Sequence, residues 1–119
     1  MKSDNVIKDK SYAFALRMIK AYKYLTQEQR EFILSKQMLR SGTSIGALIR
    51  EAEYAQSLPD FIHKLSIALK EAAETEYWIL LLKDSEYINE EVFYSIRKDC
   101  TELIKLLTSI INTSKKQNH

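Results

Sequence analysis

Apolar or small residues between positions 34 and 55 recur at alternating four-residue and three-residue steps, and this rhythm constrains the fold more than any other feature of the sequence. The series passes through both glycines of the chain, Gly42 and Gly46, without a change of phase. Two interpretations are open, a loop over residues 40–46 or one continuous helix. A loop would reset the phase, so the register favours a helix over residues 27–56. The series consists of Leu34, Met38, Ser41, Ile45, Leu48, Ala52 and Ala55.

The two glycines need a physical reason, because glycine in a helix interior costs roughly 1 kcal/mol relative to alanine. On the predicted helix Gly42 flanks the core stripe, and Gly46 lies further round, on the side of Ile49. A helix without side chains at these points allows close approach by a neighbouring helix, from the same subunit or the next. We therefore expect Gly42 and Gly46 to be packing or assembly positions, bracketed by Arg40 and Arg50.

Three further amphipathic segments predict helices over residues 5–24, 59–84 and 90–113. Their core stripes are Ile7, Phe14, Met18, Ala21 and Leu25 for the first segment, Phe61, Leu65, Ala68, Ala72, Thr75, Ile79 and Leu82 for the second, and Phe93, Ile96, Cys100, Leu103, Leu107 and Ile110 for the third. The run Thr26 to Gln29 reads as a capping box that starts the second helix, and Ser57 and Asn89 are candidate caps for the third and fourth. Residues 1–119 then form a single all-α domain, an antiparallel up-down-up-down four-helix bundle.

Composition excludes several classes of protein. No apolar run approaches the roughly 20 residues of a membrane span, and the N-terminus lacks signal-peptide features, so we expect a cytoplasmic protein. The single cysteine, Cys100, lies in an apolar stripe and is expected to be buried and structural. The chain lacks the Glu-x-x-His motif of di-iron bundles, and neither His63 nor His119 has ligand partners in sequence. We therefore expect no metal, no cofactor and no enzymatic activity.

Some apolar stripes are wider than a lone bundle requires. The first helix adds four apolar residues away from its core stripe, and the fourth adds three. A helix that is apolar nearly all round is normally buried on more than one side, so we expect self-association. The additional residues are Tyr12, Leu16, Ile19 and Tyr22 in the first helix and Ile104, Leu106 and Ile111 in the fourth.

Two sets of charged residues are candidates for function. Glu71 and Glu74 could be paired carboxylates for acid/base chemistry. However, Glu71 and Lys64 flank the core stripe, and residues in such positions usually pair with charges on a neighbouring helix. The candidate partners are Arg40 and Arg50. Trp78, on the same flank, is expected to anchor a helix contact. Outward cations on rigid helices, with Tyr24 available to stack, are candidates for holding a phosphate backbone; they are Lys20, Lys23, Lys36, Arg40 and Arg50.

A family resemblance rests on the run LRSGTSIGALIREA at residues 39–52, on DFIHKL at 60–65 and on ALKEAAETEYW at 68–78. These runs resemble the bacterial four-helix-bundle family of 23S rRNA intervening-sequence proteins, which includes the accessory variability determinant proteins of diversity-generating retroelements. The resemblance covers nearly the whole chain. Leu48 departs from it, because the family often has Asn there, so a polar contact made by that Asn is not carried over.

The resemblance implies a homopentamer with a central channel and a basic surface. It also implies a non-enzymatic role in binding RNA, DNA or a nucleic-acid enzyme such as a reverse transcriptase. Arg40, Arg50 and Lys64 are then candidate contacts, either to RNA or within the oligomer. The alternative is a structural or adaptor ring that binds a protein partner and has no affinity for nucleic acid.

Overall fold

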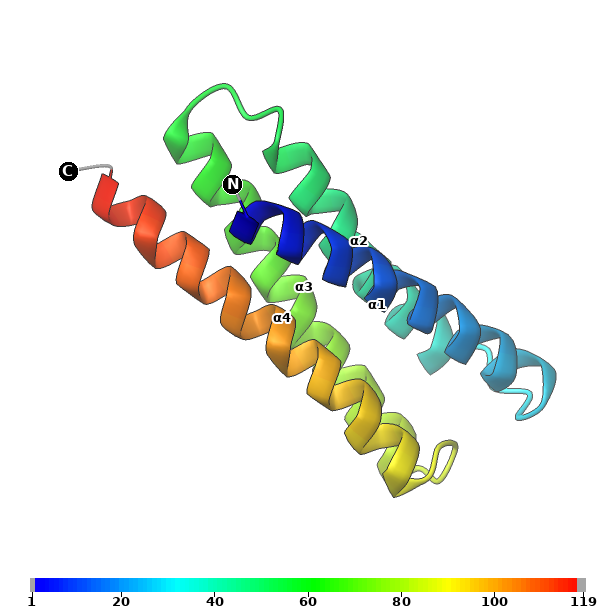
Figure 1. Cartoon of the computed structure of the whole chain (residues 1–119). Coiled ribbons are helices and arrows are strands. Elements are labelled where there is room, and N and C mark those ends of the chain that lie inside the picture. The colour runs from blue at the N-terminus through cyan, green and yellow to red at the C-terminus, as the bar shows by residue number, and fades with distance from the viewer. Residues whose placement is uncertain (1, 118–119) are drawn as a thin grey trace.

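The chain folds into four helices joined by short connections. The computed structural model describes residues 2–117, with the side chains of residues 6–117. Helix α1 spans Lys2–Gln27, α2 Leu34–Ala52, α3 Leu58–Asp84 and α4 Glu90–Gln117, and the described residues contain no strand. Figure 1 shows each helix running back along the one before it. The result is the predicted all-α up-down-up-down bundle, with dimensions of 49 × 21 × 20 Å.

The core forms where the amphipathic stripes of the four helices meet. Cys100 and most apolar residues of the predicted stripes are buried, whereas Ala21, Leu34, Leu48, Phe61 and Ile110 are partly buried and pack against the core. Leu48, where the resembling family often has Asn, is thus part of apolar packing. The buried members of the stripes are the polar Ser41 and Thr75 together with Ile7, Phe14, Met18, Leu25, Met38, Ile45, Ala52, Leu65, Ala68, Ala72, Ile79, Leu82, Phe93, Ile96, Cys100, Leu103 and Leu107.

The start of the second helix was predicted wrongly. Thr26 does not cap a helix beginning at residue 27, because α1 continues to Gln27 and the Thr26 hydroxyl donates to the carbonyl of Tyr22 at 2.9 Å. The chain then turns at Arg30, whose φ of 55° lies in the left-handed region. The capping-box pattern failed because a hydroxyl inside a helix is equally well satisfied by the carbonyl four residues earlier.

Glu31 caps α2 instead. Its carboxylate accepts hydrogen bonds from the backbone N–H groups of Ile33, Leu34 and Ser35, at 3.0, 2.9 and 2.6 Å. The Ser35 hydroxyl returns a bond to the carbonyl of Glu31 at 2.8 Å. Burial by itself raises the pKa of Glu31, but these donors outweigh it, and the net pKa is lowered. The carboxylate thereby satisfies donors that the first turn of a helix leaves free.

The other helix ends are close to the predicted ones, except that α2 stops at Ala52 rather than at residue 56. Its last turn tightens, with the N–H of Tyr54 donating to the carbonyl of Glu51 at 3.0 Å. Ser57 caps α3 as expected, since its Oγ accepts from the N–H of Asp60 at 3.2 Å. Helix α1 extends beyond the predicted 5–24 by three residues at each end, and α4 extends beyond the predicted 90–113 by four residues at its C-terminal end.

Helix α2 passes through both glycines without a break, as the register predicts. The helix that approaches them is α1 of the same chain. A Cβ at Gly42 would overlap Cγ and Sδ of Met18, and a Cβ at Gly46 would lie 3.4 Å from the carbonyl oxygen and Oγ of Ser11. The glycines therefore allow close α1–α2 packing.

Helices α1 and α4 form the least extensive of the four helix–helix contacts. In Figure 1 the tip of the α1–α2 hairpin, in blue to cyan, diverges from the tip of the α3–α4 hairpin, in yellow. The bundle is thus tightly packed between α1 and α2 and more open between α1 and α4.

Candidate functional site

The candidate cations lie mainly on α1 and α2. Lys20 and Lys23 belong to α1, Lys36 and Arg40 belong to α2, and all four are exposed. The two helices are antiparallel, and the close contact of Met18 with Gly42 fixes their relative height. Residues 20–23 of α1 therefore lie at about the same level along the bundle as residues 36–40 of α2.

The remaining two candidate cations are engaged elsewhere. Arg50 is exposed, and its guanidinium carbon lies 5.7 Å from the centre of the Tyr12 ring, a cation–π contact. Lys64, on α3, forms an interhelix ion pair with Glu51 at 3.2 Å. The structure therefore does not bring all six candidates to one site, and Arg50 and Lys64 are separated from the other four along the bundle.

Glu71 and Glu74 form no ion pair among the described residues. Burial is the main cause of a raised Glu71 pKa, and Glu74 adds to it, while Arg40 and Lys70 act in the opposite direction. Arg40 is thus the charged neighbour that sequence reasoning proposed, but without a direct contact. Trp78 is partly buried and packs against the core, with its ring 5.2 Å from that of Tyr77.

The wide apolar stripe of α4, from which self-association was expected, is largely covered within its own chain. Ile111 is 5% exposed, and Ile104 and Leu106 are partly buried against the core of their own chain. On α1, by contrast, Tyr12 and Leu16 remain more than half exposed, at 55% and 51%. The wide stripe of α1 is therefore the one that the chain itself does not cover, with Ile19 also exposed and Tyr22 partly buried.

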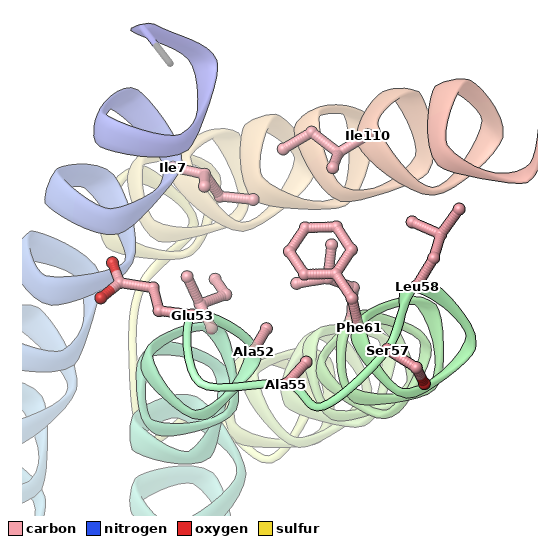
Figure 2. Close-up of a pocket in the computed structure, with 10 residues that line it drawn as sticks. Ile7, Ala52, Glu53, Ala55, Ser57, Leu58, Phe61 and Ile110 are labelled. Carbon is pink, nitrogen blue, oxygen red and sulfur yellow. The ribbon is translucent and has the colours of Figure 1, made fainter. Parts of the chain in front are cut away.

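A hollow of about 550 Å³ opens at the end of the bundle that carries the α2–α3 connection (Figure 2). Its walls are mostly aliphatic and come from all four helices, with Ile7, Phe61 and Ile110 around it. The two polar side chains in its lining are engaged, because Glu53 pairs with Lys8 at 2.8 Å and Ser57 caps α3. The hollow therefore offers apolar contact and no converging polar groups for catalysis.

A second groove, of about 390 Å³, lies between α1 and α4. Arg17 closes one part of it, because its guanidinium donates to Asp99 at 2.8 Å and to the carbonyl of Ser95 at 3.1 Å. Sequence reasoning missed this groove, because it depends on how far two helices diverge. Of its lining, the sequence had indicated Lys20 and Tyr24 as candidate nucleic-acid contacts and Asn89 as a helix cap. The lining comprises Arg17, Lys20, Ala21, Tyr24, Ile88, Asn89, Val92 and Ile96.

The groups that most often carry chemistry are not assembled within the described residues. Cys100 is buried, its Sγ donates to the carbonyl of Ala72 at 3.3 Å, and burial, with smaller effects of Glu76 and Asp99, raises its pKa to about 12. No cluster of three or more His, Cys, Asp or Glu side chains with metal-binding potential occurs in the part of the chain that the structure describes. His63 is exposed, and His119 lies outside the described residues. None of the described helices is long and apolar enough to cross a membrane.

Comparisons with known proteins agree on one family. A family model described as 23S rRNA-intervening sequence protein matches residues 3–109. A crystal structure from Bacteroides thetaiotaomicron, of a protein of unknown function from the S23 ribosomal protein family, shares 64% sequence identity with this chain. The similarity covers 92% of this chain and 98% of the other, with a TM-score of 0.92. No curated protein matches the chain.

Neither the family description nor that of the solved structure names a catalytic activity. The family match includes α2, α3, nearly all of α1 and the greater part of α4, together with the α1–α2 connection. The chain therefore belongs to the family of 23S rRNA-intervening sequence proteins.

Proposed function

We propose that this protein is a non-catalytic, self-associating helical bundle that binds nucleic acid, RNA or DNA, through the cations of its α1–α2 hairpin. The observation that carries the proposal is the charge of residues 16–43, the half of that hairpin containing its connection, which we call the basic tip. It holds six Lys or Arg residues and two Glu, a net charge of +4, whereas the whole chain carries +2.

The two acids of the basic tip do little to neutralise it. The carboxylate of Glu31 is buried and bound to the N-terminal N–H groups of α2, which leaves Glu28 as the exposed acid. Lys20, Lys23, Lys36 and Arg40 form no ion pair with any described residue. Cations held on rigid helices release counterions from a phosphate backbone when they bind it, which supplies sequence-independent affinity.

Self-association belongs to the same proposal. The exposed stripe of Tyr12, Leu16 and Ile19 on α1 supports an interface between copies of the chain. The pentamer implied by the family resemblance would repeat the basic tip five times in one assembly, so that the fields of the copies add. A reverse transcriptase is a candidate for a nucleic-acid enzyme that such an assembly would accompany.

An adaptor ring that binds only a protein is the second candidate function. It is favoured by the hollow of Figure 2, whose aliphatic walls suit an apolar side chain of a partner rather than a phosphate. The two proposals differ in salt dependence, because burial of apolar surface is little affected by moderate salt and phosphate contacts are strongly weakened by it.

The test is binding of a fluorescently labelled structured RNA across a series of salt concentrations, with the assembly mass measured by sedimentation. We expect the logarithm of the affinity to fall linearly with that of the salt concentration. The double variant Lys36→Gln/Arg40→Gln should bind more weakly and reduce that slope by about 2, at about one unit per phosphate contact. The matched control is Lys98→Gln/Lys105→Gln, which removes the same charge from exposed positions of α4.

Absence of association at low salt would refute nucleic-acid binding and leave the adaptor function. Equal losses in the two double variants would show that net charge, and not the basic tip, drives binding. A monomeric mass would remove self-association from the proposal.

A further inference from the structure

The groove between α1 and α4 borders the basic tip and differs from it in chemistry. Its floor is apolar, with Ile96 and Ile88 nearly buried and Val92 40% exposed. Its rim is cationic, with Lys20 and Arg17 on α1. Its volume of about 390 Å³ lies within the usual range of small-molecule sites. An apolar slot next to Lys20, which has no ion-pair partner among the described residues, suits a ligand with a flat, poorly hydrated part and an anionic part.

Tyr24 supplies an aromatic face in this groove. Its side chain is 45% exposed, and its hydroxyl accepts a hydrogen bond from the side-chain amide of Gln29 at 2.7 Å. The partner holds the ring at the mouth of the groove, so that little entropy is lost when a flat ligand stacks on it. Tyrosine rings that remain exposed beside cations are the usual stacking platforms for nucleobases.

Asn89 supplies a polar group at the opposite wall. Its Oδ1 accepts from the N–H of Val92 at 2.8 Å and so caps α4, which orients the side chain. Its Nδ2 donates no hydrogen bond within the described residues, and it is available to a carbonyl or ring nitrogen of a base. The groove thus combines a stacking face, an apolar floor and a directional donor.

We propose that the α1–α4 groove accepts an unpaired base of a single-stranded nucleic acid, whose phosphates lie against Lys20 and the other cations of the basic tip. This inference rests on the proposed nucleic-acid binding and specifies the form of the ligand. Paired bases of a duplex are already stacked and hydrogen-bonded, so they enter such a slot only after unpairing, which costs a few kcal/mol.

The neighbouring surface restricts where the backbone of a bound nucleic-acid strand can lie. A polar hollow of about 630 Å³ shares Tyr24 and Asn89 with the groove and is lined on its far side by Asp84, Glu86 and Glu90. These carboxylates repel phosphate, and Lys83, which also lines that hollow, is paired with Asp84 at 3.4 Å. The backbone of a bound strand therefore follows α1 on the side of Lys20.

The experiment compares a labelled single-stranded RNA with a duplex of the same length and salt, and includes 2-aminopurine in the single strand to report stacking. We expect the single strand to bind at least tenfold more tightly, with quenched 2-aminopurine emission. Tyr24→Ala should weaken single-strand binding about tenfold, within the range for loss of one stacked base, and abolish the quenching. It should leave duplex binding and the salt slope unchanged. Tyr24→Phe should retain most of the affinity.

Tyr54→Ala is the matched control, because Tyr54 is 84% exposed at the opposite end of the bundle. Circular dichroism of each variant checks that the fold is intact, and if Tyr24→Ala unfolds, the single-strand preference and the 2-aminopurine quenching of the unaltered protein still test the proposal. Equal affinity for the two RNA forms, or equal effects of Tyr24→Ala and Tyr54→Ala, would overturn the groove assignment while leaving nucleic-acid binding in place. Failure of both RNA forms to bind would instead overturn the proposed function and this inference with it.

Discussion

Helix α1 packs against two neighbours in opposite ways. On its α2 side, Gly42 and Gly46 remove side chains from the interface, and Met18 and Ser11 fill the space. On its α4 side, contacts are fewer, and surface pairs such as Arg17 with Asp99 at 2.8 Å and Lys10 with Glu102 at 3.2 Å connect the helices. The closely packed side therefore stabilises the fold, whereas the open side leaves a groove that a ligand can enter.

The largest expected effect comes from breaking the closely packed side. Gly42→Leu places a branched side chain where Met18 already lies, so the two helices must move apart. We expect a loss of about 3 kcal/mol in the free energy of unfolding, at the upper end of the range for overpacked cores. Urea denaturation measures it, with Ala47→Leu, at an exposed position of α2, as the control. A loss below 0.5 kcal/mol would contradict the close packing.

A smaller loss of stability is expected when Glu31, the cap of α2 in the α1–α2 connection, is replaced. The lowered pKa of Glu31 means that the folded state favours its ionised form, so its contribution is full above the pKa of the unfolded chain. That contribution is lost as pH falls through the lower folded pKa. Glu31→Gln should cost about 1 kcal/mol at pH 7, as for loss of a helix cap, and flatten the decrease in stability below about pH 4.5. Denaturation at several pH values checks this, and an unchanged acid profile would argue against the cap.

The second glycine sharpens the comparison within the closely packed side. A Cβ at Gly46 makes ordinary contact with Ser11 at 3.4 Å, and alanine gains helix propensity, so Gly46→Ala should stabilise by up to about 0.5 kcal/mol. Gly46→Leu has no such room and should destabilise the fold. Thermal unfolding of both variants separates the outcomes. Unchanged stability and oligomer mass in Gly46→Leu would show that nothing approaches this position.

Only a small loss of stability is expected on the open side. The Arg17–Asp99 pair is partly exposed, at 37% and 45% of the two side chains, and surface pairs contribute about 0.2–1 kcal/mol. Asp99→Asn should therefore lower the free energy of unfolding by less than 1 kcal/mol, and less still in 0.5 M salt. A loss comparable to that of Gly42→Leu would remove the contrast between the two sides.

Much of this fold could be predicted from periodicity, because a helix that buries one face must repeat apolar residues along it. The stripes located the buried residues of α3 from Leu65 to Leu82, and the register carried α2 through its glycines. Helix ends were less predictable. The cap of α2 is a glutamate that reaches forward to three N–H groups, a geometry that the sequence does not announce.

The candidate site was predictable only as separate residues. Lys20, Lys23, Lys36 and Arg40 could be placed outward by register, and Tyr24 could be named as an aromatic beside them. Their grouping at one level of the bundle could be seen only from the antiparallel alignment of α1 with α2. The pairing of Lys64 with Glu51 could be seen only from the position of α3 relative to α2 along the bundle. Periodicity likewise could not show that Ile111 is buried within its own chain, because its cover comes from other helices.

The sequence by itself determined four amphipathic helices, a continuous α2, a buried Cys100 and a chain without the motifs of a metal or catalytic bundle. These properties depend on neighbours a few residues apart, which the spacing of residue types records. Only the tertiary structure decided that α1 fills the glycine face of α2, that other helices of the chain cover the wide stripe of α4, and that α1 and α4 diverge into a groove beside the basic tip. Such features depend on the distance and relative height of whole helices, which are set by packing between residues far apart in the chain.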